Sequence, residues 1–337
     1  MSAEIDPPAG LDGVREALRE AVEVARLAPS MHNTQPWQWR IVGDHVLELR
    51  ADRSRQLPVA DPDGLLLTES CGTALHHARQ SLAAEGWLAD VAWLPTGVDP
   101  DLLARVTVTG RDRPDAAAAR LVAAARQRRT DRRPVADRPV PDAVLDQVAA
   151  AVAREGIAWH QLRHDEVVEL TVAMSRADEV EVADEAHRDE IASWVGGERA
   201  EGLGIPDAAI PEQPPRTRVP GRYFGPPGTL AVEEGHDVQA RYAILHGAGD
   251  GRVDWLRAGQ ALSAAWLTAT SLDLSLLPIS AVVEVAATRL ILRRMLAGLG
   301  YPYLAVRLGY SRPDGEPEHT PRLATATILD DQTGGTE

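Results

Sequence analysis

The 337-residue chain contains no lysine, so all 35 of its basic residues are arginines. Asparagine, cysteine and phenylalanine each occur once, as Asn33, Cys71 and Phe224. A single cysteine excludes an intrachain disulfide and a zinc site built on cysteine pairs, and it fits a reducing compartment. We expect Cys71, in an apolar stretch, to be a small buried side chain. Without lysine, both the Ser-x-x-Lys motif and a phosphate loop ending in lysine are excluded.

Long apolar runs are also missing. The longest, from Leu272 to Leu292, is interrupted by an aspartate, a proline, a glutamate and an arginine, which excludes a membrane-spanning helix. The first residues lack the basic and apolar regions of a secretion signal, so we expect a cytoplasmic protein. The net charge of -15 argues against nucleic acid or an anionic membrane as a partner. No metal-binding motif is present, and no metal is expected.

The most distinctive stretch is Ala28 to Trp37, which reads Ala-Pro-Ser-Met-His-Asn-Thr-Gln-Pro-Trp. It follows a run of apolar residues at helical spacing and contains two prolines, so it is expected to be a polar turn at a helix end. The only asparagine of the chain lies inside it. Two interpretations stay open here: Asn33 binds a ligand, or Ser30 and Asn33 bond the local backbone in a capped turn.

The periodicity predicts an α+β fold in which antiparallel sheets pack against helices. Helices are expected at 18–27, 65–86, 116–126, 141–155, 165–176, 184–194, 255–272 and 286–298, and strands at 37–41, 47–49, 90–94, 103–109, 157–162, 242–245 and 304–308. Residues 275–278 are expected to form a turn or strand, and 320–329 alternate as a possible further strand. The short polar break near residue 112 predicts two domains, 1–111 and 112–337.

Residues 196–227 are rich in proline and glycine and lack any periodic pattern. A loop of that length is usually a functional cover or disordered. It contains Tyr223 and Phe224, which suggests a segment that packs on something. We therefore predict a lid insertion at 196–227.

The two halves resemble each other. Gly72-Thr73-Ala74-Leu75 matches Gly259-Gln260-Ala261-Leu262, and the helix from Leu18 matches the helix from Leu145. Only the first half continues into the Asn33 turn. Only the second half carries the cluster Arg128 to Arg133, so each half retains what the other lacks.

These motifs resemble the nitroreductase-like flavoproteins. Ala-Pro-Ser-x-x-Asn-x-Gln-Pro-Trp, followed by Arg-Arg-Thr-x-Arg after a helix, is similar to the family's flavin-binding segments. The order of the motifs, the long insertion and Arg307-Leu308-Gly309-Tyr310 are similar to the Acg branch. The resemblance implies two nitroreductase-like units fused in one chain as a pseudo-dimer. It also implies one FMN per chain between the two halves, and a monomer is plausible because the halves mimic the family dimer.

The resemblance implies roles for named residues. The phosphate would lie on the arginine segment and on one late arginine, and the ring would lie on the polar turn and on a stretch around the second-half proline. These candidates are Arg128, Arg129, Thr130, Arg132 and Arg322 for the phosphate, and Pro29, Ser30, Met31, Asn33, Pro278, Ile279, Ser280 and Ala281 for the ring. The family usually has Glu-Gly where this chain has Ser280-Ala281, so hydrogen bonding at the reactive ring nitrogen differs. The plainer alternatives are a helix end rich in cations for the arginines and a simple turn for Pro278.

Two functions are compatible with this sequence. One is an FMN oxidoreductase that takes hydride from NAD(P)H and reduces a small acceptor; the flavin performs the chemistry, so no catalytic side chain is assigned. The other is an FMN-binding or FMN-sequestering protein, in which the lid with Tyr223 and Phe224 closes the substrate face and turnover is low or absent.

Overall fold

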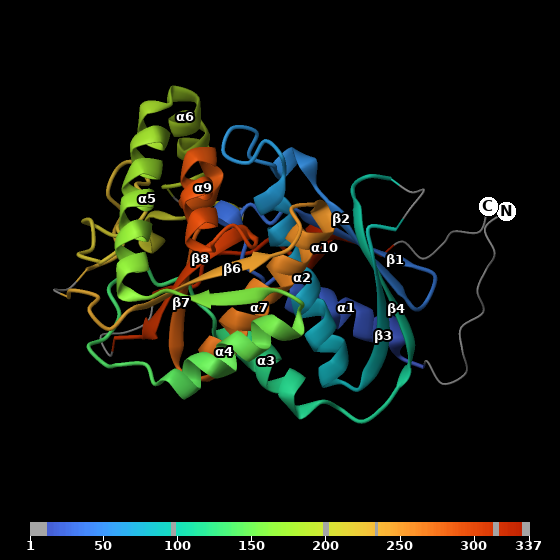
Figure 1. Cartoon of the computed structure of the whole chain (residues 1–337). Coiled ribbons are helices and arrows are strands. Elements are labelled where there is room, and N and C mark those ends of the chain that lie inside the picture. The colour runs from blue at the N-terminus through green and yellow to red at the C-terminus, as the bar shows by residue number, and fades with distance from the viewer. Residues whose placement is uncertain (1–11, 96–98, 198–201, 233–234, 313–316, 332–337) are drawn as a thin grey trace.

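The computed structural model describes residues 12–95, 99–197, 202–232, 235–312 and 317–331. The N-terminal residues used in the prediction of localisation, and residues 198–201 of the predicted lid, lie outside these ranges. Two β-sheets lie on opposite sides of the molecule, with long helices between them (Figure 1). The predicted α+β fold is confirmed.

The first sheet has the strand order β3-β4-β2-β1-β9. Its strands are β1 (Trp37–Val42), β2 (Val46–Ala51), β3 (Trp87–Trp93), β4 (Leu102–Arg111) and β9 (Leu329–Asp330). The predicted hairpin is confirmed: alternate residues of β1 are buried, and Gly43, at φ +59°, makes the turn to β2. All pairs are antiparallel except β1 with β9.

The second sheet has the order β5-β6-β8-β7 and is antiparallel throughout. Its strands are β5 (Ala158–Gln161), β6 (Arg241–Gly247), β7 (Leu274–Ile279) and β8 (Tyr301–Tyr310). Pro278 lies in β7, at the edge of the sheet, where a missing backbone donor is tolerated. The interpretation of Pro278 as a simple turn is therefore wrong.

The predicted helices are present, with shifted ends. They are α1 (Val14–Ala25), α2 (Leu65–Ala84), α3 (Ala116–Gln127), α4 (Asp142–Arg154), α5 (His164–Ala183), α6 (Glu185–Trp194), α7 (Arg252–Ser271), α8 (Ala281–Glu284), α9 (Ala286–Met295) and α10 (Thr325–Ile328). The expectation of a strand across 320–329 is mostly wrong, because 325–328 form a helical turn and only 329–330 pair with β1. The described part of the chain contains no helix long and apolar enough to cross a bilayer.

The long helices α2 and α7 pack against each other at the centre of the molecule (Figure 1). Each belongs to one of two large apolar cores: Leu75 lies in the core under the first sheet, and Trp266 lies in the core under the second. Cys71 is fully buried in the first core, as expected. The molecule therefore has two layered halves joined through two helices, consistent with the pseudo-dimer.

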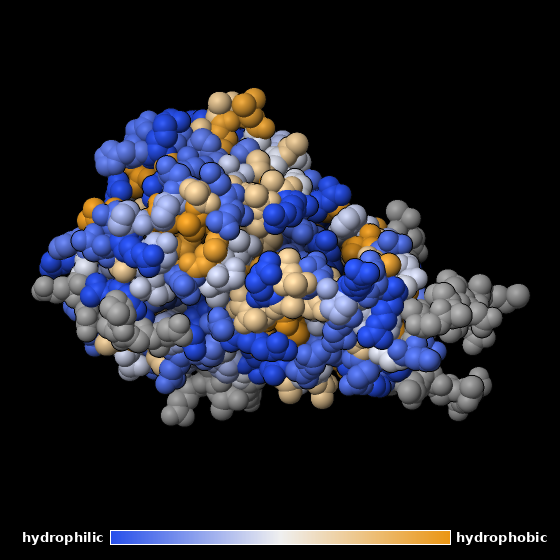
Figure 2. Space-filling model, turned by 90° about the horizontal axis from the view of Figure 1, so that it is seen from below, coloured by the Kyte–Doolittle hydropathy of each residue, from blue (hydrophilic) through white to orange (hydrophobic). Residues whose placement is uncertain are grey.

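The C-terminal segment crosses between the halves, since β9 follows the second sheet in sequence but joins the first. The domain boundary near residue 111 stays a prediction. On the face shown in Figure 2, apolar residues form small groups separated by hydrophilic ones.

Candidate functional site

A cavity lies between the two halves, beside α2 and α7. It brings together segments that are far apart in the sequence: the polar turn, the arginine segment, the end of β7 and the late arginine. Of the sequence-predicted site residues, the cavity is lined by Pro29, Ser30, Met31, Asn33, Arg128, Thr130, Arg132, Pro278, Ile279, Ser280, Ala281 and Arg322. Arg129 does not line it and lies on the other side of the arginine segment, beside Gln127.

The polar turn is held in an unusual backbone conformation. His32, Asn33 and Gln35 all have positive φ, at 45°, 57° and 48°. Residues other than glycine rarely adopt this backbone conformation. The Ser30 hydroxyl accepts a hydrogen bond from the Gln35 amide at 2.9 Å. This hydrogen bond stabilises the strained turn locally. Ser30 therefore bonds the local backbone, as the capped-turn interpretation predicts.

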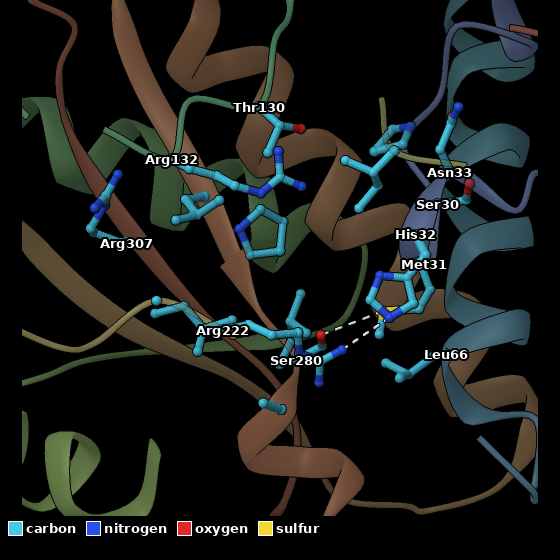
Figure 3. A pocket seen from close by; sticks show the side chains of 18 of the residues that line it. Ser30, Met31, His32, Asn33, Leu66, Thr130, Arg132, Arg222, Ser280 and Arg307 are labelled. Carbon is cyan, nitrogen blue, oxygen red and sulfur yellow. Dashed lines mark hydrogen bonds between the residues drawn. The ribbon is translucent and has the colours of Figure 1, made fainter. Parts of the chain in front are cut away.

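Two side chains of α2 fix the turn to the helix. The Met31 amide donates to the Ser70 hydroxyl at 3.1 Å, and the Thr73 hydroxyl donates to the Pro29 carbonyl at 2.6 Å. Met31 then faces the second half, where its sulfur accepts a hydrogen bond from Ser280 at 3.5 Å (Figure 3). The turn forms one wall of the cavity and β7 supplies part of the opposite wall.

Asn33 connects three segments. Its side-chain nitrogen donates to the carbonyls of Gly202, Gly204 and Pro321 at 3.2, 3.0 and 2.9 Å, and its oxygen accepts from Arg322 at 3.0 Å. The amide is therefore engaged with protein atoms on both ends. Its predicted role at the flavin's pyrimidine edge stays a prediction and would require exchange of at least one of these bonds.

Three arginines of the cavity lack a carboxylate partner; Arg128 is buried, and Arg132 and Arg322 are half-buried. In the part of the chain that the structure describes, no ion pair joins Arg128, Arg132 or Arg322 to an acid. The Arg128 guanidinium stacks on Trp266 at 4.4 Å from the ring centre, and its Nε and Nη1 have no hydrogen-bond partner. Burial lowers the pKa of Arg128 well below its usual value, and it lowers the pKa values of Arg132 and Arg322 to about 10.

This arrangement indicates an anion site. Burying a cation without a counter-ion is costly, and an anion at the same place offsets that cost. Thr130 and Arg132 lie together on the second-half side of the cavity, across from Ser30 and Asn33 (Figure 3). The interpretation of the cluster as a helix end does not explain why it leaves α3 at Arg128 and enters a cavity.

Several lining residues were not identified from the sequence. They include Leu66, Glu69, Ser70 and Thr73 of α2, Leu262 and Trp266 of α7, Arg307 of β8, and Arg222 of the 202–232 segment. Glu69 is 4% exposed, its Oε1 has no partner, and burial raises its pKa well above the usual value. Burial therefore disfavours the ionised form of this acid, which lies among the arginines of the cavity. Arg307 donates to the carbonyls of Asp131 and Arg133 and holds the arginine segment in place.

A search of protein-family models found no match. Among curated proteins, a Mycobacterium tuberculosis protein named "Putative NAD(P)H nitroreductase Rv3131" is 36% identical over 323 residues, which cover 94% of this chain and 91% of that protein. The chain belongs to the nitroreductase family. The "Putative NAD(P)H nitroreductase acg" of the same organism is 31% identical over 91% of this chain and 93% of its own length. The resemblance to the Acg branch is confirmed.

Solved nitroreductases match part of the chain. The "FMN and NADPH-dependent nitroreductase NfnB" of a sphigopyxis strain has a TM-score of 0.41 and 15% identity, covering 64% of this chain and 99% of its own. A nitroreductase with bound FMN from Desulfitobacterium hafniense has a TM-score of 0.39 and 14% identity, covering 60% of this chain and 94% of its own.

Proposed function

We propose that this nitroreductase-family chain binds one FMN in the cavity and uses NAD(P)H to reduce a small acceptor. The observation that carries the proposal is the set of three cavity arginines without carboxylate partners, of which Arg128 is buried and Arg132 and Arg322 are half-buried. FMN has a phosphate dianion, and guanidinium groups bind phosphate oxygens in pairs with fixed geometry. When bound, the flavin would supply hydride and electron transfer.

The residues present fit the group. Arg128, Thr130, Arg132 and Arg322 would hold the phosphate, and the unpartnered nitrogens of Arg128 and Arg322 would find acceptors there. Pro29, Met31 and the Pro278 to Ala281 stretch offer mostly apolar surfaces on facing walls for a planar ring. Both walls come from one chain, so we propose that a monomer holds a complete site.

The test is an absorption spectrum of the purified protein before and after FMN is added, followed by anaerobic NADPH. We expect stoichiometric FMN binding and then bleaching of the flavin bands. A chain that takes up no FMN contradicts the site, whereas bound FMN that neither NADH nor NADPH bleaches contradicts the oxidoreductase.

A second function is favoured by a specific contact of the lid segment. Arg222 reaches out of that segment and forms ion pairs with Glu181 of α5 at 2.9 Å and Glu284 of α8 at 2.5 Å. It also contacts His32 at 3.1 Å (Figure 3), and Phe224 stacks under Arg132 with 5.1 Å from guanidinium to ring centre. The segment therefore covers the cavity through buried contacts, which supports an FMN-sequestering protein with little turnover.

Tyr223 does not share this role. Its side chain is 56% exposed and does not line the cavity, so the prediction that Tyr223 occludes the substrate face is wrong. Phe224 alone remains as the occluding aromatic residue.

Arg222→Gln distinguishes the two functions. If the lid limits access, the variant should release FMN faster and be bleached faster by NADPH than the wild type. Arg218→Gln is the matched control, because Arg218 lies in the same segment but bonds the exposed His164 instead. Equal bleaching rates in wild type and both variants would contradict a lid that blocks access.

A further inference from the structure

A second cluster of chemically active side chains lies where α5, α6 and α8 meet. Glu181, His187 and Glu284 each place one potential ligand atom within 4.8 Å of the others. All three side chains are nearly buried: Glu181 is 6% exposed, Glu284 2% and the His187 residue 8%. None of them lines the cavity proposed for FMN.

The charges of the cluster do not balance. One guanidinium, that of Arg222, faces two carboxylates, and its Nη2 contacts the Oε1 atoms of both Glu181 and Glu284. Asp178, on the same helix as Glu181, adds a further negative charge that acts on Glu181 and Arg222. Asp184 and Glu190 likewise place negative charge near His187. When both carboxylates are ionised, their negative charge exceeds the positive charge of the one guanidinium, and a bound cation would offset the difference.

Two ligand atoms of the cluster have no partner. Among the described residues, neither Glu284 Oε2 nor His187 Nε2 makes a hydrogen bond, although both are buried. Buried polar atoms are nearly always satisfied by a protein group, a water or an ion. The unpartnered Nε2 of a neutral His187 imidazole has a lone pair that it can donate to a metal.

We propose that Glu181, His187 and Glu284 bind one divalent transition-metal ion of the Zn²⁺ type. One imidazole and two carboxylates are a donor set that suits zinc, and three protein ligands leave a position for water. Arg222 would stay on the Oε1 side of both carboxylates, where it fixes their orientation but repels the ion. The site would tie α8 to the corner between α5 and α6, next to the residue that fastens the lid segment.

The sequence gives no sign of this site. Glu181 and His187 are six residues apart on two different helices, and Glu284 is nearly a hundred residues further on. No spacing motif links them, which is why the sequence led us to expect no metal.

The test uses the full chain after dialysis against a chelator, with Zn²⁺ measured by calorimetry and Co²⁺ by its visible absorption. We expect one ion per chain. Since loss of an outer-shell partner already weakens metal sites about 10–100-fold, His187→Gln and Glu284→Gln should each weaken binding at least about tenfold. Arg222→Gln should tighten binding, because it removes the repelling cation.

His160→Gln is the matched control. His160 also contacts a glutamate, Glu166, at 3.0 Å, but it lies outside the cluster, so its variant should bind the ion like the wild type. Circular dichroism of each variant checks that it is folded. Wild-type affinity no greater than that of His187→Gln, or equal loss in His160→Gln, would overturn the proposal. Neither readout depends on flavin, so failure here leaves the proposed FMN function standing.

Discussion

Gly72 of α2 and Gly259 of α7 contact each other where the two helices cross. A Cβ added to Gly72 would come within 3.0 Å of the Gly259 Cα and closer still to the Leu256 carbonyl, and a Cβ on Gly259 would collide with the Glu69 backbone. The relationship is reciprocal, because Glu69 and Leu256 each lie three residues before their helix's glycine. Matching positions of the internal repeat therefore meet their own counterparts, as expected at the axis of a two-fold pseudo-dimer.

Gly72→Ala and Gly259→Ala should each destabilise the fold. The added methyl group meets backbone, which cannot move aside as a side chain can, so we expect losses at the upper end of overpacking, about 3 kcal/mol. Urea unfolding measures the loss. The double variant should lose less than the sum, because both changes open the same contact.

Gly110→Ala is the control for this pair. Gly110 has ordinary φ, and its added Cβ would meet only Leu88 at 3.8 Å, so its variant should stay within about 0.5 kcal/mol of the wild type. If all three variants unfold at the same urea concentration as the wild type, the close approach of α2 and α7 is not real.

The repeat could be found in the sequence because close helix crossings require small residues at fixed positions. The family resemblance, carried by the Asn33 turn and the arginine motif, implied the candidate residues, and all but one of them line one cavity. Glu69 and Trp266 escaped notice for the opposite reason. The helices α2 and α7 lie between other layers and are buried along most of their length, so no polar stripe distinguishes a cavity-lining position from a core position.

Contacts between residues far apart in the sequence were the second feature that the sequence could not predict. Arg222 lies in a stretch without periodicity, and its partners Glu181 and Glu284 belong to other elements. Nothing in the local sequence specifies these contacts. The same applies to β9, whose two residues pair with β1 across nearly the whole length of the chain.

Arg128→Met should stabilise the FMN-free protein but weaken its binding of FMN. Without FMN, the variant removes a buried cation that has no carboxylate partner, so we expect an increase of about 1–3 kcal/mol in the free energy of unfolding. With FMN, it removes charge-assisted hydrogen bonds to the phosphate, so affinity should fall about 10–100-fold. Thermal unfolding and flavin fluorescence titration measure the two effects.

Arg129→Met is the matched control for this experiment. Arg129 is adjacent in sequence but does not line the cavity, so FMN affinity should change little. Asn33→Ala should also lower FMN occupancy, because the amide holds Arg322 and the 202–204 backbone around the cavity. Equal loss of flavin after substitution of Arg129 and Arg128 would show that the phosphate lies elsewhere.

His76 should make the fold sensitive to acid. Burial lowers its pKa to about 3, and its Nδ1 pairs with the Ser263 hydroxyl at 2.8 Å. The folded state keeps His76 neutral, while the unfolded chain takes up a proton below about pH 6.5. Its contribution to stability is therefore complete above pH 6.5 and is lost toward pH 3, by about 1.4 kcal/mol per pH unit. His76→Gln should show a shallower loss of melting temperature between pH 7 and pH 5, whereas substitution of the exposed His236 should leave the slope unchanged.

Glu69→Gln should act at the other end of the pH range. Because burial raises the Glu69 pKa in the folded state, the folded protein keeps this proton after the unfolded chain has released it near pH 4.3. The wild type therefore loses stability as the pH rises above that value, until the folded carboxyl also ionises, and the slope is at most about 1.4 kcal/mol per pH unit. The amide of the variant does not titrate, so the wild type and Glu69→Gln should differ least at pH 4, and the variant should be the more stable one at pH 8. Unfolding curves at both pH values measure this difference.

Glu179→Gln, on the exposed face of α5, is the control and should show no such divergence from the wild type. If the difference in stability between Glu69→Gln and the wild type is the same at both pH values, Glu69 carries its charge in the cavity with a partner.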